Sequence, residues 1–296
     1  MNLKKVLSLL LALVLVISSL CSCSIKFADI DSANVISNEN PLRVHFLDVG
    51  QGDSLFIEMP NDETMLIDTG ENYHGEGIID YINDCGYSKI DYLVGTHPHS
   101  DHIGSMGYIV RNYNIGNIYM PKVSANTKTY ENLLTSISDK GLKVKTAKAG
   151  VNIVSNDDLT VDIIAPVTID NDNLNNSSVV IKLIYKDTSY LFTGDAEKEE
   201  IASMQADVSA DVLKVGHHGS KTSTTNAFLK EVNPQIAVIS CGEDNEYGHP
   251  HKSTLNYLEK NHCEIYRTDV DKTVIISSDG TDYSIQTDVN SIERVR

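Results

Sequence analysis

The sequence predicts a single α/β domain built as a layered sandwich of sheets and helices. From about residue 42 onward, short apolar runs are separated by Gly, Asn, Asp and Pro, a pattern typical of strands. Helix-like stretches lie between groups of these runs, and no internal repeat or low-complexity linker divides this part of the chain. Strand-rich halves with helices between them favour stacked layers around a shared core.

The first 22 residues have the pattern of a secretory signal. Lys4 and Lys5 give a basic start, and an apolar run over 6–17 follows. A retained membrane anchor needs about 20 apolar residues, and this run is shorter. The segment ends in Leu-Cys-Ser-Cys, which resembles a bacterial lipobox because the small Ser22 precedes Cys23. We therefore expect a lipidated Cys23 at the mature N-terminus, with plain secretion as the alternative.

Composition and charge indicate how the rest of the chain is divided and which kinds of binding are disfavoured. Residues 23–41 are polar and aperiodic, so we expect a flexible tether, a domain over 42–288 and a C-terminal tail over 289–296. The expected location is the outer face of the cell membrane, with the lipid as the membrane contact, and no protein partner is inferred. The formal net charge of −17 disfavours nonspecific binding of duplex DNA, which depends on lysine and arginine contacts. The cysteines beyond the leader follow no CxxC spacing, which disfavours a cysteine zinc site.

The domain begins with three strands in a meander. Runs over 42–49, 53–60 and 64–70 contain alternating apolar residues with turn signals between them. A helix-like stretch near 77–85 then precedes a buried strand over 91–96. Later strands are expected over 117–120, 161–166, 178–185, 189–195, 210–216, 236–241, 264–268 and 273–278, and helices over 103–111, 129–140, 197–204, 223–231 and 253–260.

A histidine-rich loop, Thr-His-Pro-His-Ser-Asp-His over 96–102, follows the strand at 91–96. Ends of strands are where mixed α/β folds usually place their sites. Two histidines two residues apart can point the same way from an extended loop, and an aspartate and a third histidine then turn toward a neighbouring point. Imidazole and carboxylate ligands suit zinc, manganese or iron. The spacing therefore predicts two ligands for each of two adjacent metal ions.

Two later strand ends supply further candidates. Asp195 follows an apolar strand through Thr193 and Gly194, although Gly-Asp alone is also an ordinary turn. His217 and His218 follow another strand, and we expect one of them to face the metal ions while the other points elsewhere. The coincidence of three strand-end clusters favours a shared site.

These motifs together resemble the metallo-β-lactamase-fold hydrolases, and most closely the C-terminal hydrolase domain of the ComEC-type competence proteins. The resemblance rests on VHFLDVGQGDS, LIDTG, HPHSDH, NNSSVVIKL, LFTGD, LKVGHHGSKTS and YGHPH, which occur in this order. It covers about residues 42–285 and implies a four-layer αββα sandwich. It also implies a hydrolase that uses two divalent metal ions, zinc or manganese.

The resemblance implies a role for each site residue. His97 and His99 would bind the first metal ion, Asp101 and His102 the second, and Asp195 would bridge them. Of the histidine pair, His218 is favoured for the second ion. The usual third histidine of the first ion is missing, and Asn175 to Ser178 stand in its region. Two carboxylates would support the ligands as hydrogen-bond partners: Asp53 and Asp68.

The resemblance also implies the chemistry. A water bridging two divalent cations acquires a lowered pKa and becomes a hydroxide nucleophile. Asp101 would orient or deprotonate this water, and His217 or His249 could protonate the leaving group. Four residues are expected to contact the substrate: Asn176, Ser177, Ser220 and Lys221.

Three functions stay open at this stage. The first is phosphodiester hydrolysis, with DNA (possibly single-stranded) or another phosphoester as substrate. The second is ester, lactone or lactam hydrolysis on the same site. The third is a noncatalytic metal-binding surface module, which the complete set of metal ligands argues against.

Overall fold

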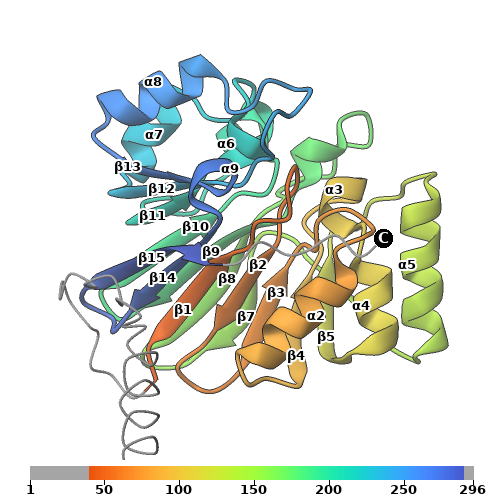
Figure 1. Ribbon diagram of the computed structural model, residues 1–296. Helices are drawn as coiled ribbons and strands as arrows, with labels where there is room; N and C mark the ends of the chain where they lie inside the picture. Colours follow the sequence, from red (N-terminus) through yellow and green to blue (C-terminus); the bar gives the residue numbers. More distant parts are fainter. Residues whose placement is uncertain (1–39, 290–296) are drawn as a thin grey trace, which may run out of the picture. The chain divides into compact units, whose positions relative to one another are not determined.

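The computed structural model describes residues 40–289, and these form two mixed β-sheets packed face to face (Figure 1). Sheet A has eight strands in the order β15-β14-β1-β2-β3-β4-β5-β6, and sheet B has seven in the order β13-β12-β11-β10-β9-β8-β7. The strands of sheet A are β1 (Leu42–Phe46), β2 (Leu55–Glu58), β3 (Thr64–Ile67), β4 (Lys89–Val94), β5 (Asn114–Met120), β6 (Val144–Thr146), β14 (Thr273–Ser278) and β15 (Tyr283–Val289). Those of sheet B are β7 (Val151–Ser155), β8 (Leu159–Ala165), β9 (Val180–Tyr185), β10 (Thr188–Phe192), β11 (Val212–Lys214), β12 (Ile236–Ile239) and β13 (Glu264–Arg267).

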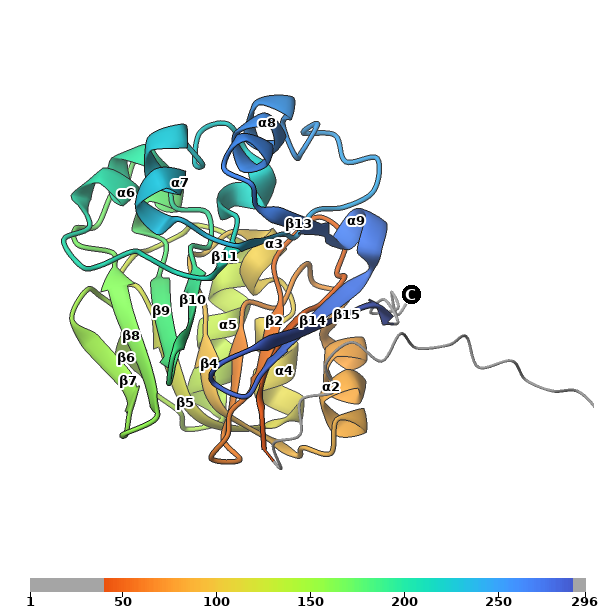
Figure 2. The same cartoon turned by 90° about the vertical axis from the view of Figure 1, so that its left-hand side faces the viewer.

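Helices cover the outer face of each sheet, as the two views show (Figures 1 and 2). The helices beside sheet A are α2 (Gly75–Asp84), α3 (Ser100–Ile103), α4 (Met106–Asn112) and α5 (Lys128–Asp139). Those on the side of sheet B are α6 (Lys198–Ser203), α7 (Asn226–Val232) and α8 (Lys252–Lys260). The short α9 (Thr268–Asp271) joins β13 to β14, and two 3₁₀ turns, η1 (Leu174–Ser177) and η2 (Gly216–Gly219), follow β8 and β11.

Three apolar clusters hold the layers together. The first lies between the sheets and combines inward side chains of both, such as Phe46 and Phe192. The second packs the outer face of sheet A against its helices, and the third does the same for sheet B with Phe228 and Leu258. Consecutive residues of β3 belong to different clusters, with Met65 facing the other sheet and Leu66 facing the helices. The four-layer αββα sandwich expected from the sequence is therefore confirmed.

The structure corrects some expected elements. The helix expected over 103–111 is two helices, α3 and α4, with Gly104 and Ser105 between them. A Cβ atom on Gly104 would lie 2.6 Å from the backbone nitrogen of Asn72, so the chain bends against the loop after β3. Strands β6, β7 and β15 were not expected, and each lies at or next to the edge of a sheet.

The expected signal, lipid attachment at Cys23 and most of the tether lie outside the described residues. Among residues 40–289, no helix is both long and apolar enough to cross a membrane.

Candidate metal centre

The histidine-rich loop leaves the carboxyl end of β4 and is fixed by Asp68, which directly follows the neighbouring strand β3. The Asp68 carboxylate accepts a hydrogen bond from the backbone N–H of Thr96 at 2.8 Å and one from its hydroxyl at 2.6 Å. Asp68 itself has a positive φ of 57°, a conformation that aspartate tolerates better than most residues. The parallel pairing of β3 and β4 brings these two strand ends together.

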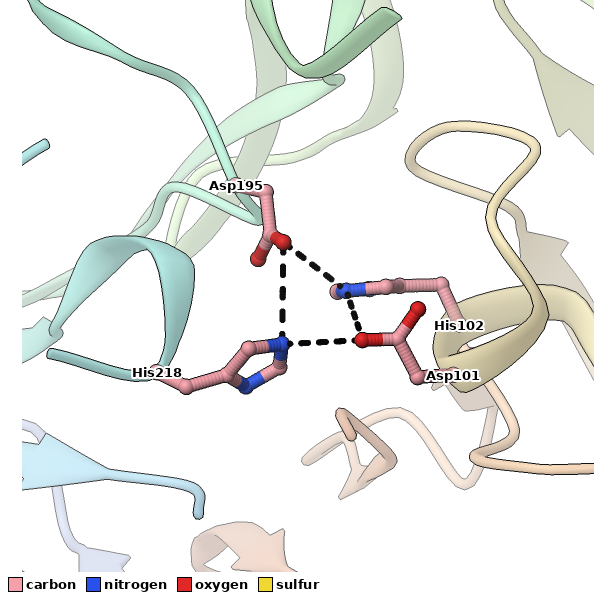
Figure 3. Close-up of side chains that lie close together, drawn as sticks. All are labelled: Asp101, His102, Asp195 and His218. Carbon is pink, nitrogen blue, oxygen red and sulfur yellow. Dashed lines mark ion pairs between the residues drawn. The ribbon is translucent and has the colours of Figure 1, made fainter. Parts of the chain in front are cut away.

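Four side chains from three distant segments converge at this edge (Figure 3). Asp195 Oδ2 lies 3.3 Å from His102 Nε2 and 3.6 Å from His218 Nε2. Asp101 Oδ2 lies 3.3 Å from His218 Nε2 and 3.8 Å from His102 Nε2. The four ligand atoms all lie within 4.8 Å of one another. We call these four residues the metal cluster.

Hydrogen bonds fix both imidazoles of the metal cluster with Nε2 toward its centre. His102 Nδ1 lies 2.7 Å from Asp68 Oδ2, and His218 Nδ1 lies 3.0 Å from the carbonyl oxygen of Ser240. A carbonyl can only accept, so His218 Nδ1 carries the proton. The Nε2 atoms of both rings are buried and have no hydrogen-bond partner among the described residues. Partnered Nδ1 and free Nε2 atoms are the arrangement of histidines that bind a metal ion.

The charges of the cluster also fit a cation. Burial alone would raise the pKa of Asp195 and lower that of His102. Their mutual attraction, together with the charges of His218 and Asp101, holds the pKa of Asp195 well below its usual range and that of His102 well above it. The buried carboxylates are therefore stabilised by positive charge at the centre, which a divalent cation would supply. The donor set of two imidazoles and two carboxylates suits zinc or manganese.

His97 and His99 lie beside the metal cluster, with the ring centroids of His97 and His102 4.2 Å apart. His97 Nε2 is 2.9 Å from His99 Nδ1 and 3.9 Å from Asp195 Oδ2. Since the hydroxyl of Thr96 already donates to Asp68, it accepts from His97 Nδ1 at 3.1 Å. His97 therefore also presents Nε2 toward Asp195, and the structure brings together all six residues expected as metal ligands.

Asp195 reaches the centre through a tight turn after β10. Gly194 has a positive φ of 50°, and a Cβ atom there would lie 3.1 Å from the Cβ of Thr96. Ser178 braces the same region, since its Oγ accepts from the backbone N–H of Asp195 at 3.3 Å and lies 3.4 Å from His97 Nδ1. Ser178 was not singled out from the sequence. The sequence feature that could have pointed to it is its place in the Asn-Asn-Ser-Ser run, which stands where the usual third histidine is missing.

Asp53 lies behind His218 and is paired with a buried lysine. Lys214 Nζ is 2.7 Å from Asp53 Oδ2, and both side chains are 1% exposed. Asp53 Oδ1 lies 3.4 Å from His218 Nδ1. Although burial would raise the pKa of Asp53, Lys214 and His218 lower it to about 2. Sequence reasoning missed Lys214 because a lysine within a strand, Val-Leu-Lys-Val, gives no sign that it points inward.

A cavity of about 390 Å³ opens onto the metal cluster. Its walls are formed by Gln51, Pro98, His99, Ser100, Asp101, Thr127, Asn175, Asp195, His217, His218, Tyr247 and His249. His217 and His249, the two alternatives expected for the proton donor, line it with ring centroids 5.6 Å apart. A second cavity of about 510 Å³ shares Gln51, Ser100, Asp101 and Tyr247 with the first.

The four residues expected to bind substrate do not line the cavity beside the metal cluster. The Ser177 hydroxyl is fully buried and donates to the Asp170 carbonyl, and Asn176 Nδ2 lies 3.4 Å from Asp170 Oδ2. Neither lines the cavity, whereas their neighbour Asn175 does. Ser220 is buried beside Thr222 with 3.0 Å between their hydroxyl oxygens, and the exposed Lys221 also stands outside the cavity lining.

Comparison with known proteins agrees with this geometry. The family model described as the metallo-beta-lactamase superfamily matches residues 47–243. ComE operon protein 3 of Bacillus subtilis (strain 168) is 33% identical over 251 residues, which are 78% of this chain and 32% of that protein. Recombination protein 2 of Haemophilus influenzae is 31% identical over 242 residues, 79% of this chain and 28% of that protein. The chain thus spans about a third of the length of these curated relatives.

Among solved structures, CmlA, a diiron β-hydroxylase from Streptomyces venezuelae, aligns with a TM-score of 0.53 at 14% identity, over 78% of this chain and 53% of that one. This likeness concerns the fold alone. Members of the superfamily are generally metal-dependent hydrolases, and the fold implies divalent metal ions, for which the metal cluster is a plausible place. The family match, which covers more than half of the chain, shows that this chain belongs to the metallo-beta-lactamase superfamily.

Proposed function

We propose that the chain is a binuclear metal-dependent hydrolase of phosphodiester bonds that acts outside the cell. The observation that carries this proposal is the convergence of several imidazole nitrogens on one buried carboxylate, that of Asp195. Three Nε2 atoms lie near Asp195 Oδ2: that of His102 at 3.3 Å, that of His218 at 3.6 Å and that of His97 at 3.9 Å. Paired metal positions about a shared carboxylate suit in-line displacement at phosphorus, where both the attacking and the leaving oxygens need stabilisation.

Different groups around the cavity would carry out different parts of the hydrolysis. Bound divalent cations would lower the pKa of water and stabilise negative charge on the substrate. Asp101, whose side chain is 27% exposed, faces the cavity and would orient the attacking water and accept its proton. His249 lines the same cavity and would pass a proton to the leaving oxygen.

The negative charge of the second cavity, which adjoins the first at Asp101, disfavours highly charged anionic substrates. The second cavity has one lysine among many carboxylates: its acidic walls are Asp48, Glu71, Asp101, Glu243, Asp244, Glu246 and Asp269. A long polyanion on this surface would be repelled, because sequence-independent binding of DNA relies on lysine and arginine contacts. We therefore propose a substrate with one phosphodiester at the metal cluster and little flanking charge, or a single strand that avoids the acidic cavity.

The test is turnover by the metal-loaded protein of bis(p-nitrophenyl) phosphate, single-stranded DNA, p-nitrophenyl acetate and a simple lactone. We expect hydrolysis of the phosphodiester substrates and its loss in Asp101→Asn. The matched control is Asp80→Asn, which changes an exposed aspartate on α2 and should leave turnover unchanged. Turnover of the ester or lactone alone would reject the phosphodiester assignment. Stable metal binding without turnover of any of these substrates would support a binding module instead.

For location, we propose a leader over 1–22, a lipid at Cys23 and a tether over 23–41. The support is the basic start, the short apolar run and the Ser22-Cys23 pair. Metabolic labelling with a palmitate analogue should mark the protein and should disappear in Cys23→Ala. Equal labelling of both forms would reject the lipid anchor.

A further inference from the structure

The adjacent histidines His217 and His218 both occupy the left-handed region, with φ/ψ of 50°/50° and 53°/26°. This conformation is strained for a non-glycine residue, and such residues cluster at functional sites. In an extended chain, neighbouring side chains would point in opposite directions. Here the curled backbone brings both rings toward Asp195, and each Nε2 lies 3.6 Å from Asp195 Oδ2. The expectation that one of the pair points elsewhere therefore does not describe this turn.

The rings of His217 and His218 both approach Asp195, but they have different neighbouring residues. Their centroids are 6.1 Å apart and their planes are inclined by 72°. His218 Nε2 also lies 3.3 Å from Asp101 Oδ2, which places it in the metal cluster. His217 is not among the members of that cluster, although it reaches the same oxygen of Asp195.

A carboxylate fixes the other nitrogen of His217. Its Nδ1 lies 3.3 Å from Glu197 Oε1 and 3.3 Å from the hydroxyl oxygen of Thr222. Thr222 donates to Glu197 Oε1 at 2.7 Å, and Asn173 Nδ2 donates to Glu197 Oε2 at 2.9 Å. Glu197 is thus held at both oxygens. A histidine whose Nδ1 proton is directed to a carboxylate presents its Nε2 lone pair, as histidines that bind metal ions do.

We propose that the pair divides between the two metal positions, with His218 binding the ion of the metal cluster and His217 binding the ion beside His97 and His99. His217 would then take the place of the histidine that is missing from the Asn-Asn-Ser-Ser run. The inference rests on the binuclear site of the proposed function and is independent of the substrate.

Asn175 is the competing ligand for the same position. Its Oδ1 is buried without a hydrogen-bond partner among the described residues, and the side chain lines the cavity with His99 and Asp195. An amide oxygen is a weaker ligand than imidazole for zinc. His217 is the stronger candidate because its Nε2 lies 3.6 Å from Asp195 Oδ2 and its Nδ1 is held by Glu197.

The experiment measures metal binding directly. Full-length protein is equilibrated with buffered Zn²⁺ or Mn²⁺, bound metal is counted by mass spectrometry, and the Mn²⁺ form is examined by electron paramagnetic resonance for a coupled pair. We expect about two ions per chain in the wild type and about one in His217→Ala, with loss of the coupled signal. Glu197→Gln should keep both positions but weaken one about tenfold or more.

The matched control is His262→Ala, because His262 is an exposed histidine that also has a positive φ, 59°, and does not line the cavity. It should retain two ions, and circular dichroism should verify the fold of each variant. Two ions of unchanged affinity in His217→Ala would overturn the proposal, as would loss of one ion in Asn175→Ala but not in His217→Ala. A wild type that binds one ion would also overturn it. Because none of these readouts uses turnover, absence of phosphodiesterase activity would leave this result intact.

Discussion

A single carboxylate, that of Asp68, determines which nitrogen of His102 is available to a metal ion. Asp68 is fully buried, and it fixes both the backbone of Thr96 and the ring of His102. Burial raises the pKa of Asp68 above its ordinary value despite the opposing charge of His102. The ligand geometry of the loop thus depends on a residue that lies outside the metal cluster.

We predict that Asp68→Asn lowers metal affinity about 10–100-fold. Asparagine tolerates the positive φ at this position, so the backbone should survive. Its amide would direct a donor toward Thr96 or His102, which already donate to this position, and would favour the tautomer of His102 that blocks Nε2. Competition with a fluorescent chelator measures the affinity. Wild-type affinity in a folded Asp68→Asn protein would contradict this role.

The buried ion pair between Lys214 and Asp53 also contributes to the site at the scale of single residues. Removal of one partner of a buried ion pair leaves an unpaired charge and typically costs about 3–5 kcal/mol. We predict a loss of this size in the free energy of unfolding for Lys214→Met, and recovery of most of it in the double variant Lys214→Met/Asp53→Asn. Denaturant unfolding monitored by circular dichroism gives the values.

Lys182→Met serves as the control for that series. Lys182 is also a lysine in sheet B. Its Nζ lies 3.7 Å from Asp207 Oδ2, but the side chain of Asp207 is 76% exposed. Its replacement should cost clearly less than that of Lys214. Equal losses for both lysines would show that the charge of Asp53 is not the cause.

At the scale of elements, α6 places a buried acid beside the 3₁₀ turn η1, the segment that leads into Ser178. Glu200 is 4% exposed, and burial raises its pKa to about 9. The unfolded chain would have the ordinary value of 4.5. The folded state therefore favours the protonated acid, and its stability falls as pH rises from about 4.5 toward 9. By pH 7 the loss is about 3 kcal/mol, at about 1.4 kcal/mol per pH unit.

We accordingly predict that Glu200→Gln raises the melting temperature at pH 8 and has a much smaller effect at pH 5. Glutamine keeps the shape of the protonated acid and cannot ionise. The control is Glu199→Gln on the same helix, since Glu199 is 59% exposed and should show no such dependence on pH. A shift of equal size at both pH values would argue against ionisation as the cause.

Most of the strands that the sequence predicted are strongly buried; the edge strand β13, which has no buried residue, is an exception. Strand β4 and strand β10 have contiguous apolar residues, and the loops after them were correctly placed at strand ends. In contrast, β6 is exposed at all three residues and β15 has no buried residue. Edge strands bury little surface, so their sequences lack the apolar pattern by which strands are recognised.

At the scale of the whole molecule, the centre combines loops from both sheets. The local loops could be predicted because histidine and aspartate clusters are rare. The contacts of Ser178, Lys214 and Ser240 could not, because serine and lysine are common in strands and loops and their roles arise from contacts with residues distant in the sequence. The left-handed turn at His217 and His218 was also beyond prediction, since its conformation depends on the contacts of the folded site.

Net charge leads to the last prediction, on ionic strength. Most DNA-binding proteins lose affinity as salt rises, because they release counterions from phosphates. This chain has a formal net charge of −17, and acidic residues line the cavity beside Asp101. Added salt shortens the Debye length from about 30 Å at 0.01 M to about 8 Å at 0.15 M. Repulsion of a polyanion should therefore weaken, so kcat/KM for single-stranded DNA should rise several-fold over this range. Bis(p-nitrophenyl) phosphate carries a single charge, and its kcat/KM should change little.

The triple variant Glu243→Gln/Asp244→Asn/Glu246→Gln removes three of the acidic groups without altering the metal ligands. It should raise the rate on DNA at low salt and flatten the dependence on salt, while the rate on the small substrate stays the same. The comparison separates local repulsion at this cavity from the field of the whole chain, because the variant changes only a small part of the net charge. A rate on DNA that falls with salt in the wild type would instead indicate a cationic path for the strand, in conflict with the acidic surface beside the metal cluster.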